Sequence, residues 1–236
     1  MTLKNFSDLF LDLDSSNSSN NKVEILRNYF LTNNALENSW TIYLLIGKNN
    51  KRFISGRSLK LLFSEIHEYP LWLIDACYLK VGDSAEVITL LLRNKNISKN
   101  QKLKDVSLNE LLNIILPELA LLKEDLKKLK VKEIWKELPK ENHLIFNKIL
   151  TGTFRVGVSI GLITKAISKL SKVDEALISH RLMGDFNPSC EAYEFLINKK
   201  VKLEELNYKP YPFLLAHTFE KKISKESIKD FQYEWK

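Results

Sequence analysis

The residues best suited to binding a ligand are glycines and basic residues that lie together between apolar segments. In the second half of the chain an apolar stretch ends at Gly152, and Arg155, Gly157 and Ser159 lead into the next apolar stretch. A loop of this kind exposes backbone N–H groups beside the positive end of the following helix, which favours an anion. The planar guanidinium of Arg155 can hold a phosphate through two parallel hydrogen bonds. The pattern therefore predicts a phosphate-binding loop, whose candidate residues are Lys148, Thr151, Gly152, Arg155, Gly157 and Ser159.

A similar arrangement occurs in the first half of the chain. Gly152 follows Gly47 by 105 residues, and segment 176–185 aligns with segment 74–83 at a spacing of 102 residues. This indicates a duplicated unit with an internal pseudo-two-fold, in which residues 94–140 are inserted between the copies. Two such loops on one face could bind two rows of phosphates that flank a groove. In the alternative interpretation the glycines are only helix caps and the basic residues a solvated rim. The candidates in the first copy are Lys48, Lys51 and Arg52.

The elements that carry these loops are predicted to be helices. Apolar residues at positions 6, 9, 10 and 13 recur with helical spacing. Ser107 and Glu110 form a capping-box pattern, and Asn187 followed by Pro188 suits the start of another helix. The chain has only 7 glycines and few hairpin-turn signals, which argues against a β-sandwich. We therefore expect an all-α domain over residues 1–205, followed by an extended linker.

Composition narrows the class of protein further. The formal net charge of +7 favours a polyanionic partner, although AT-rich coding would also raise the lysine content. Cys77 and Cys190 lack metal-ligand spacing and are typical of reduced thiols in a cytoplasmic protein. The sequence contains no P-loop motif, no paired-histidine zinc motif and no apolar run that could span a membrane. We expect a cytoplasmic monomer without a metal site.

Several segments together resemble a known family. Residues 146–159 contain the pattern Leu-x-Gly-x-x-Arg-x-Gly, and this segment is similar to the signature of the N-terminal DNA-binding domain of ATP-dependent DNA ligases, especially the bacterial type. Residues 80–86 and 180–184 resemble further landmarks of that domain. Residues 211–217 resemble the entry to the nucleotidyltransferase domain, and Glu234-Trp-Lys236 resembles the start of its first motif. The matches follow the family's order along nearly the whole chain.

This resemblance implies a helical domain with a pseudo-two-fold that lies on the minor groove around a nick. Its binding would rest on phosphate contacts and would therefore be sensitive to salt. By the same resemblance, Lys236 is the lysine that takes AMP from ATP, and Glu234 lies beside the adenine. Residues 206–236 would be the linker and the start of the adenylation domain. The full-length family enzyme uses ATP and Mg²⁺, and it seals nicks in DNA repair, recombination and replication.

The resemblance also has limits along this sequence. The family's first motif continues into Asp-Gly after the lysine, whereas the sequence ends at Lys236. We therefore expect this chain to bind nicked or duplex DNA near the nucleoid, to hold no cofactor tightly, and not to ligate by itself. A separate polypeptide that carries the rest of the ligase is one candidate partner. The alternatives are a stand-alone nick-binding or scaffold protein derived from a ligase, and a helical protein-interaction module with an incidental basic face.

Overall fold

The architecture is helical in all parts of the chain that are described. The computed structural model describes residues 2–47, 52–94, 101–154, 156–183 and 186–200, and every regular element within these ranges is a helix. The all-α prediction is therefore confirmed. The first helices are α1 (Leu3–Ser15), α2 (Ser19–Thr32), α3 (Ala35–Leu45), α4 (Gly56–His67), α5 (Leu71–Val81) and α6 (Ser84–Asn94). A middle group follows, with α7 (Leu108–Glu110), the π-helical turn η1 (Leu111–Ile115), α8 (Leu116–Leu121), α9 (Glu124–Glu137) and the 3₁₀ turn η2 (Lys140–Asn142). The last helices are α10 (His143–Thr151), α11 (Ile160–Ser171), α12 (Glu175–Leu182) and α13 (Cys190–Ile197).

Local sequence accounts for several helix boundaries. The Ser107 hydroxyl accepts a hydrogen bond from the Glu110 N–H at 3.0 Å, as its capping pattern predicts. Pro117 follows the widened turn η1, which accommodates a residue that lacks an N–H. The prediction that Asn187 caps a helix is wrong. Helix α13 begins at Cys190, and its cap is Ser189, whose hydroxyl accepts from the Ala192 N–H at 3.0 Å.

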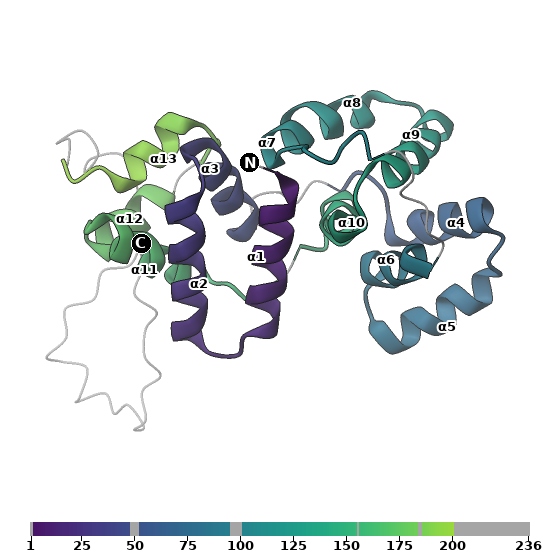
Figure 1. Ribbon diagram of the computed structural model, residues 1–236, viewed down its shortest axis with the longest axis horizontal. Helices are drawn as coiled ribbons and strands as arrows, with labels where there is room; N and C mark the ends of the chain where they lie inside the picture. The colour runs from purple at the N-terminus through teal and green to yellow at the C-terminus, as the bar shows by residue number, and fades with distance from the viewer. Residues whose placement is uncertain (1, 48–51, 95–100, 155, 184–185, 201–236) are drawn as a thin grey trace, which may run out of the picture.

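The helices gather into two lobes, seen side by side in Figure 1. One lobe contains α1, α2 and α3 together with α11, α12 and α13, and α2 packs against α11. The other lobe contains α4, α5 and α6 with α10 and α9. Helices α7 and α8 run along the top of the view between them. Each lobe is therefore built from segments that are distant in the sequence.

The internal repeat is present in the structure as four pairs of corresponding helices, which are α3 with α10, α4 with α11, α5 with α12, and α6 with α13. Helix α4 corresponds to α11, and both are 12 residues long. Their caps are equivalent: Ser55 accepts from the Ser58 N–H, and Ser159, 104 residues later, accepts from the Leu162 N–H. Helices α5 and α12 begin at the same spacing of 104 residues, so the sequence alignment at 102 residues is shifted by two in this segment. Residues 94–140 contribute α7, α8 and α9, which have no counterpart in the repeat.

The first helix of each copy is exchanged between the lobes. Helix α3 packs against α13 of the other copy, and its counterpart α10 packs against α6. The connections from α3 to α4 and from α10 to α11 therefore both cross from one lobe to the other. These two crossing connections are the segments in which the sequence predicts phosphate-binding loops.

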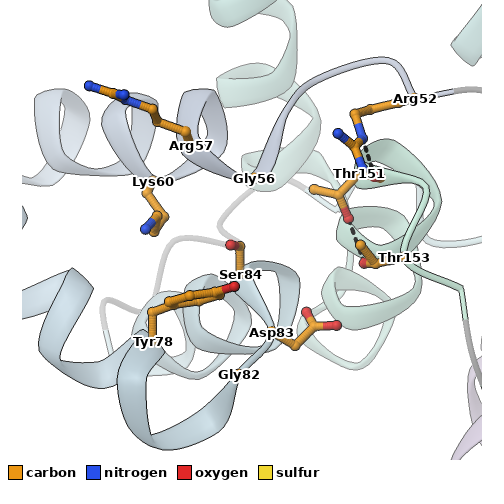
Figure 2. A pocket seen from close by; sticks show the side chains of 10 residues that line it. All are labelled: Arg52, Gly56, Arg57, Lys60, Tyr78, Gly82, Asp83, Ser84, Thr151 and Thr153. Carbon is orange, nitrogen blue, oxygen red and sulfur yellow. Dashed lines mark hydrogen bonds between the residues drawn. The ribbon is translucent and has the colours of Figure 1, made fainter.

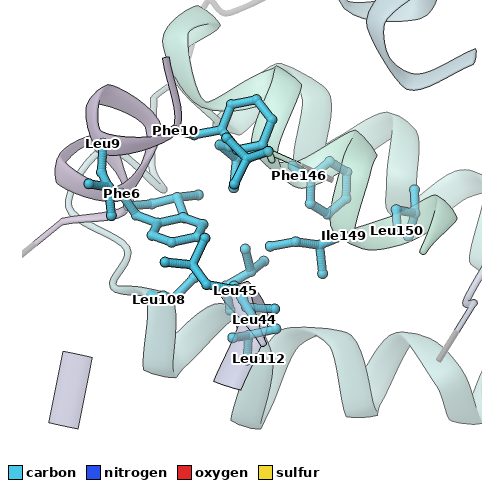
Figure 3. Close-up of a cluster of buried hydrophobic side chains, with 14 of the residues drawn as sticks. Phe6, Leu9, Phe10, Leu44, Leu45, Leu108, Leu112, Phe146, Ile149 and Leu150 are labelled. Atoms are coloured by element: carbon cyan, nitrogen blue, oxygen red, sulfur yellow. The ribbon is translucent and has the colours of Figure 1, made fainter. Parts of the chain in front are cut away.

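A shared hydrophobic core lies where the lobes meet. Figure 3 shows side chains from α1, α3, α7, η1 and α10 converging on one cluster. Phe6 and Phe10 of α1 both contact the ring of Phe154 in the second crossing connection, with ring centroids 5.6 and 5.1 Å apart. Since burial of a large aromatic side chain contributes on the order of 2–3 kcal/mol, these contacts anchor the connection to the core.

A buried polar network fixes the helix that ends at the candidate loop. The indole N–H of Trp135 in α9 donates to the Asn147 amide oxygen at 2.8 Å, and the Asn147 amide donates to the Thr89 hydroxyl of α6 at 3.0 Å. These three residues are buried, so an unpaired member would carry a desolvation cost. The network holds α10 between α9 and α6.

Candidate phosphate-binding site

The two crossing connections meet at the C-terminal end of α10. The backbone N–H groups of Phe53 and Ile54 both donate to the carbonyl oxygen of Leu150, at 3.0 and 3.1 Å. The guanidinium of Arg52 donates through Nε to the carbonyl oxygen of Thr151 at 3.3 Å. Carbonyl groups at a helix end have no partners within the helix, and these donors satisfy them. The first connection is thereby fixed against the second copy of the repeat.

A pocket of about 340 Å³ opens beside this junction. Figure 2 shows Lys60 and Tyr78 on one side, Arg52, Thr151 and Thr153 on the other, and the first turn of α4 between them. The Ser55 hydroxyl caps the Ser58 N–H, while the N–H groups of Gly56 and Arg57, in the first turn of α4, have no acceptor within the helix. The lining residues are Arg52, Gly56, Arg57, Lys60, Tyr78, Gly82, Asp83, Ser84, Thr151 and Thr153.

The balance of charge in this pocket is positive. Lys60 forms an ion pair with Asp75 and lies 4.5 Å from the centroid of the Tyr78 ring. The Asp83 carboxylate is also occupied, since one oxygen accepts from the Glu86 N–H and the other pairs with the Lys148 ammonium at 3.0 Å.

The remaining cations are Arg52 and Arg57, both exposed. Among the described residues neither has a carboxylate partner within 4.0 Å. Two uncompensated guanidinium groups at a helix N-terminus favour an anion with several oxygens, such as a phosphate.

Gly56 is required for the shape of the pocket. A Cβ atom added at this position would lie 2.7 Å from the hydroxyl oxygen of Ser84 and 3.2 Å from its Cβ. The start of α4 thus approaches the start of α6 more closely than a side chain allows. This contact places the N-termini of two helices at one pocket.

The second connection has a related but simpler geometry. Gly152 and Gly157 both have positive φ angles, of 65° and 61°, which are the backbone conformations that favour glycine. Ser159 is exposed and caps α11, and its hydroxyl lies 3.4 Å from the Leu162 nitrogen. The ammonium of Lys22, from α2, reaches the carbonyl oxygens of Val156 and Gly157.

The sequence candidates fall into four groups in the structure. Arg52, Gly157 and Ser159 lie at the surface, and Gly152 is partly buried at the end of α10. Lys148 and Thr151 are buried: Lys148 pairs with Asp83 beneath the pocket, and the Thr151 hydroxyl donates to the Asn147 carbonyl oxygen at 2.9 Å. Their predicted contacts with DNA stay predictions. The candidates outside the described residues are Lys48, Lys51, Arg155, Glu234 and Lys236.

The sequence interpretation missed Arg57, Lys60 and Lys22. A basic residue directly after Gly56, at a serine-capped helix start, was a usable signal for Arg57. Nothing in the sequence links Lys22 to a loop more than 130 residues away.

Other kinds of site find no support in the described ranges. No group of three His, Cys, Asp or Glu residues there could hold a metal ion. Nor does any helix in those ranges have the length and apolar character needed to cross a membrane.

Comparison with known proteins agrees with this architecture. The family model described as DNA ligase N terminus matches residues 2–168, which is more than half of the chain. No curated protein matches the chain. The matched span includes both crossing connections and the whole pocket. The chain therefore belongs to the DNA ligase N-terminal family, as the N-terminal region of an ATP-dependent DNA ligase.

Proposed function

We propose that this ligase N-terminal region binds duplex DNA through its phosphates, at the pocket beside α4 and at the second crossing connection. The observation that carries the proposal is the pair of exposed guanidinium groups, Arg52 and Arg57, which lack carboxylate partners among the described residues and flank a helix N-terminus. Membership of the ligase family supports DNA as the source of the phosphates.

The chemistry of the pocket favours contact with the DNA backbone over reading of bases. Guanidinium groups and helix N–H groups both donate hydrogen bonds to phosphate oxygens. Phosphate contacts release counterions from DNA, so they supply affinity that depends on salt and not on base sequence. We therefore expect this region to hold nicked and intact duplexes of any sequence.

The internal repeat gives the proposal its geometry. The pocket lies at the start of α4 and the second connection leads into α11, the counterpart of α4. A pseudo-two-fold between two phosphate sites matches the approximate two-fold symmetry of the two strands of a duplex. Each connection would then contact one strand across a groove.

The catalytic part of the proposal rests on the family alone. In the family reaction we assign the adenylated lysine to Lys236 and a contact with adenine to Glu234, with ATP and Mg²⁺ as the cofactors of the full-length enzyme. Arg155 and the candidates Lys48 and Lys51 keep their proposed contacts with DNA. Nick sealing in repair, recombination and replication would be the process served.

Hydrogen exchange with and without a nicked duplex tests the location of the site. The proposal predicts slower exchange on DNA binding at residues 52–60 and 152–162, which contain the free amides of α4 and α11. The segment from α8 to α9, outside the repeat, is the internal reference and should not change. Protection confined to α8 and α9 would refute the proposed site.

A further inference from the structure

The two copies of the repeat differ in the source of their positive charge. In the first copy, α4 itself carries Arg57 and Lys60 in its first turns, and both line the pocket. At a spacing of 104 residues, the equivalent positions in α11 are Gly161 and Thr164. The start of α11 therefore lacks the cations that its counterpart provides, although its serine cap is the same.

Lys22 of α2 brings a charge to this position from outside the repeat. Its Nζ atom lies 3.2 Å from the Val156 carbonyl oxygen and 3.1 Å from that of Gly157. A Cβ atom added at Gly157 would come within 3.2 Å of the same Nζ atom, so the glycine also leaves room for the ammonium. The ammonium thus sits directly on the second crossing connection, close to Ser159.

The neighbours of Lys22 hold it there without neutralising it. Helix α2 packs against α11, and the Glu24 carboxylate joins them through a 2.8 Å bond from the Lys169 ammonium. This hydrogen bond lowers the pKa of the Glu24 carboxyl. Glu24 also pairs with Arg27 at 3.4 Å. In the part of the chain that the structure describes, no carboxylate lies within 4.0 Å of the Lys22 ammonium.

Among the described residues the Lys22 ammonium has two acceptors, which leaves one of its N–H donors without a partner there. A lysine ammonium carries three N–H donors, and the two carbonyl oxygens occupy two of them. Lys22 is only partly buried, so an external oxygen can reach the third donor. The free N–H groups of the first turn of α11 lie on the same connection, beyond Ser159.

We propose that Lys22 is a phosphate-binding residue of the second connection, which it also positions through the two carbonyl oxygens. It supplies in the second copy the charge that Arg57 supplies in the first. This inference rests on the proposed binding of DNA and names a residue outside both copies of the repeat. The ligand is a phosphodiester oxygen of the duplex.

The test is a salt titration of DNA affinity for four forms of the full chain. They are wild type, Lys22→Met, Lys22→Arg and the matched control Lys4→Met. Lys4 is an exposed lysine of α1 at the far end of the α1–α2 pair, where Asn5 contacts Asn33. Lys22→Met should lower the slope of log affinity against log salt by about 0.9, the contribution of one phosphate contact. Lys22→Arg and Lys4→Met should both keep the wild-type slope.

The outcomes separate this inference from the proposed function. If wild type binds DNA with a steep salt slope and Lys22→Met keeps that slope, Lys22 does not contact phosphate and the inference fails. A uniform loss of affinity at every salt concentration would show that Lys22 only positions the loop, which also overturns it. If wild type itself does not bind, the proposed function fails first. Should Lys22→Met unfold, Lys22→Gln retains an amide donor for the carbonyl oxygens and is measured in its place, with the same expected loss of slope.

Discussion

Removing the two uncompensated guanidinium groups is the sharpest perturbation of the proposed site. The double substitution Arg52→Met and Arg57→Met keeps the long apolar stems and deletes both charges. Each phosphate contact contributes about 0.9 to the slope of log affinity against log salt, so the variant should lose about 1.8. Between about 50 and 200 mM salt, the ratio of wild-type to variant affinity should shrink roughly twelvefold, because the affinity of the variant falls less steeply with salt.

Fluorescence anisotropy with a labelled nicked duplex measures these affinities. The matched control is Lys4→Met with Lys104→Met, which removes the same charge from two exposed lysines that do not line the pocket. Long-range attraction alone predicts equal slopes for the two double variants. Equal slopes, or an unchanged slope in the arginine variant, would refute a direct role of Arg52 and Arg57 in phosphate binding.

Three further predictions concern residues that shape the domain. Gly56→Ala should destabilise the fold by about 1–3 kcal/mol in urea unfolding, and Ser84→Ala should recover part of the loss by removing the 2.7 Å contact. Burial raises the pKa of the Glu37 carboxyl above 4.5, so the folded chain binds the carboxyl proton more tightly than the unfolded chain. The stability of wild type relative to Glu37→Gln should therefore fall as pH rises from 4.5 through the folded pKa. A stability difference that rises with pH would contradict this. Arg181 donates to three carbonyl oxygens at and beyond the end of α13, so Arg181→Met should cost about 2 kcal/mol or more and speed amide exchange near Asn198; unchanged exchange there would exclude this role.

Much of the fold was predictable because it is encoded locally. Apolar residues at helical spacing and serine caps such as Ser107 mark the helices through short-range contacts. The repeat was visible because both copies need glycine at the same backbone position: Gly47 and Gly152 have φ angles of 74° and 65°. The exchange of α3 and α10 between the lobes could not be predicted, since it depends on packing between helices that begin 155 residues apart (α3 and α13) and 59 residues apart (α6 and α10).

The candidate site was predicted only in part, for a related reason. Backbone features such as Gly157 and Ser159 have local signatures, whereas the direction of a side chain depends on what surrounds it. Lys148 follows the basic pattern of the loop, yet burial turns it inward to Asp83. Lys22 reaches the site only because α2 packs on α11, and no spacing in the sequence predicts that contact.

We propose that this ligase N-terminal region binds DNA by its phosphates. The most direct measurement is the affinity of the purified chain for a nicked duplex as salt increases. We expect log affinity to fall linearly with log salt, with a slope of at least about 2 to 3, from the two guanidinium groups and Lys22. Absence of binding at low salt, or an affinity that does not change with salt, would contradict it.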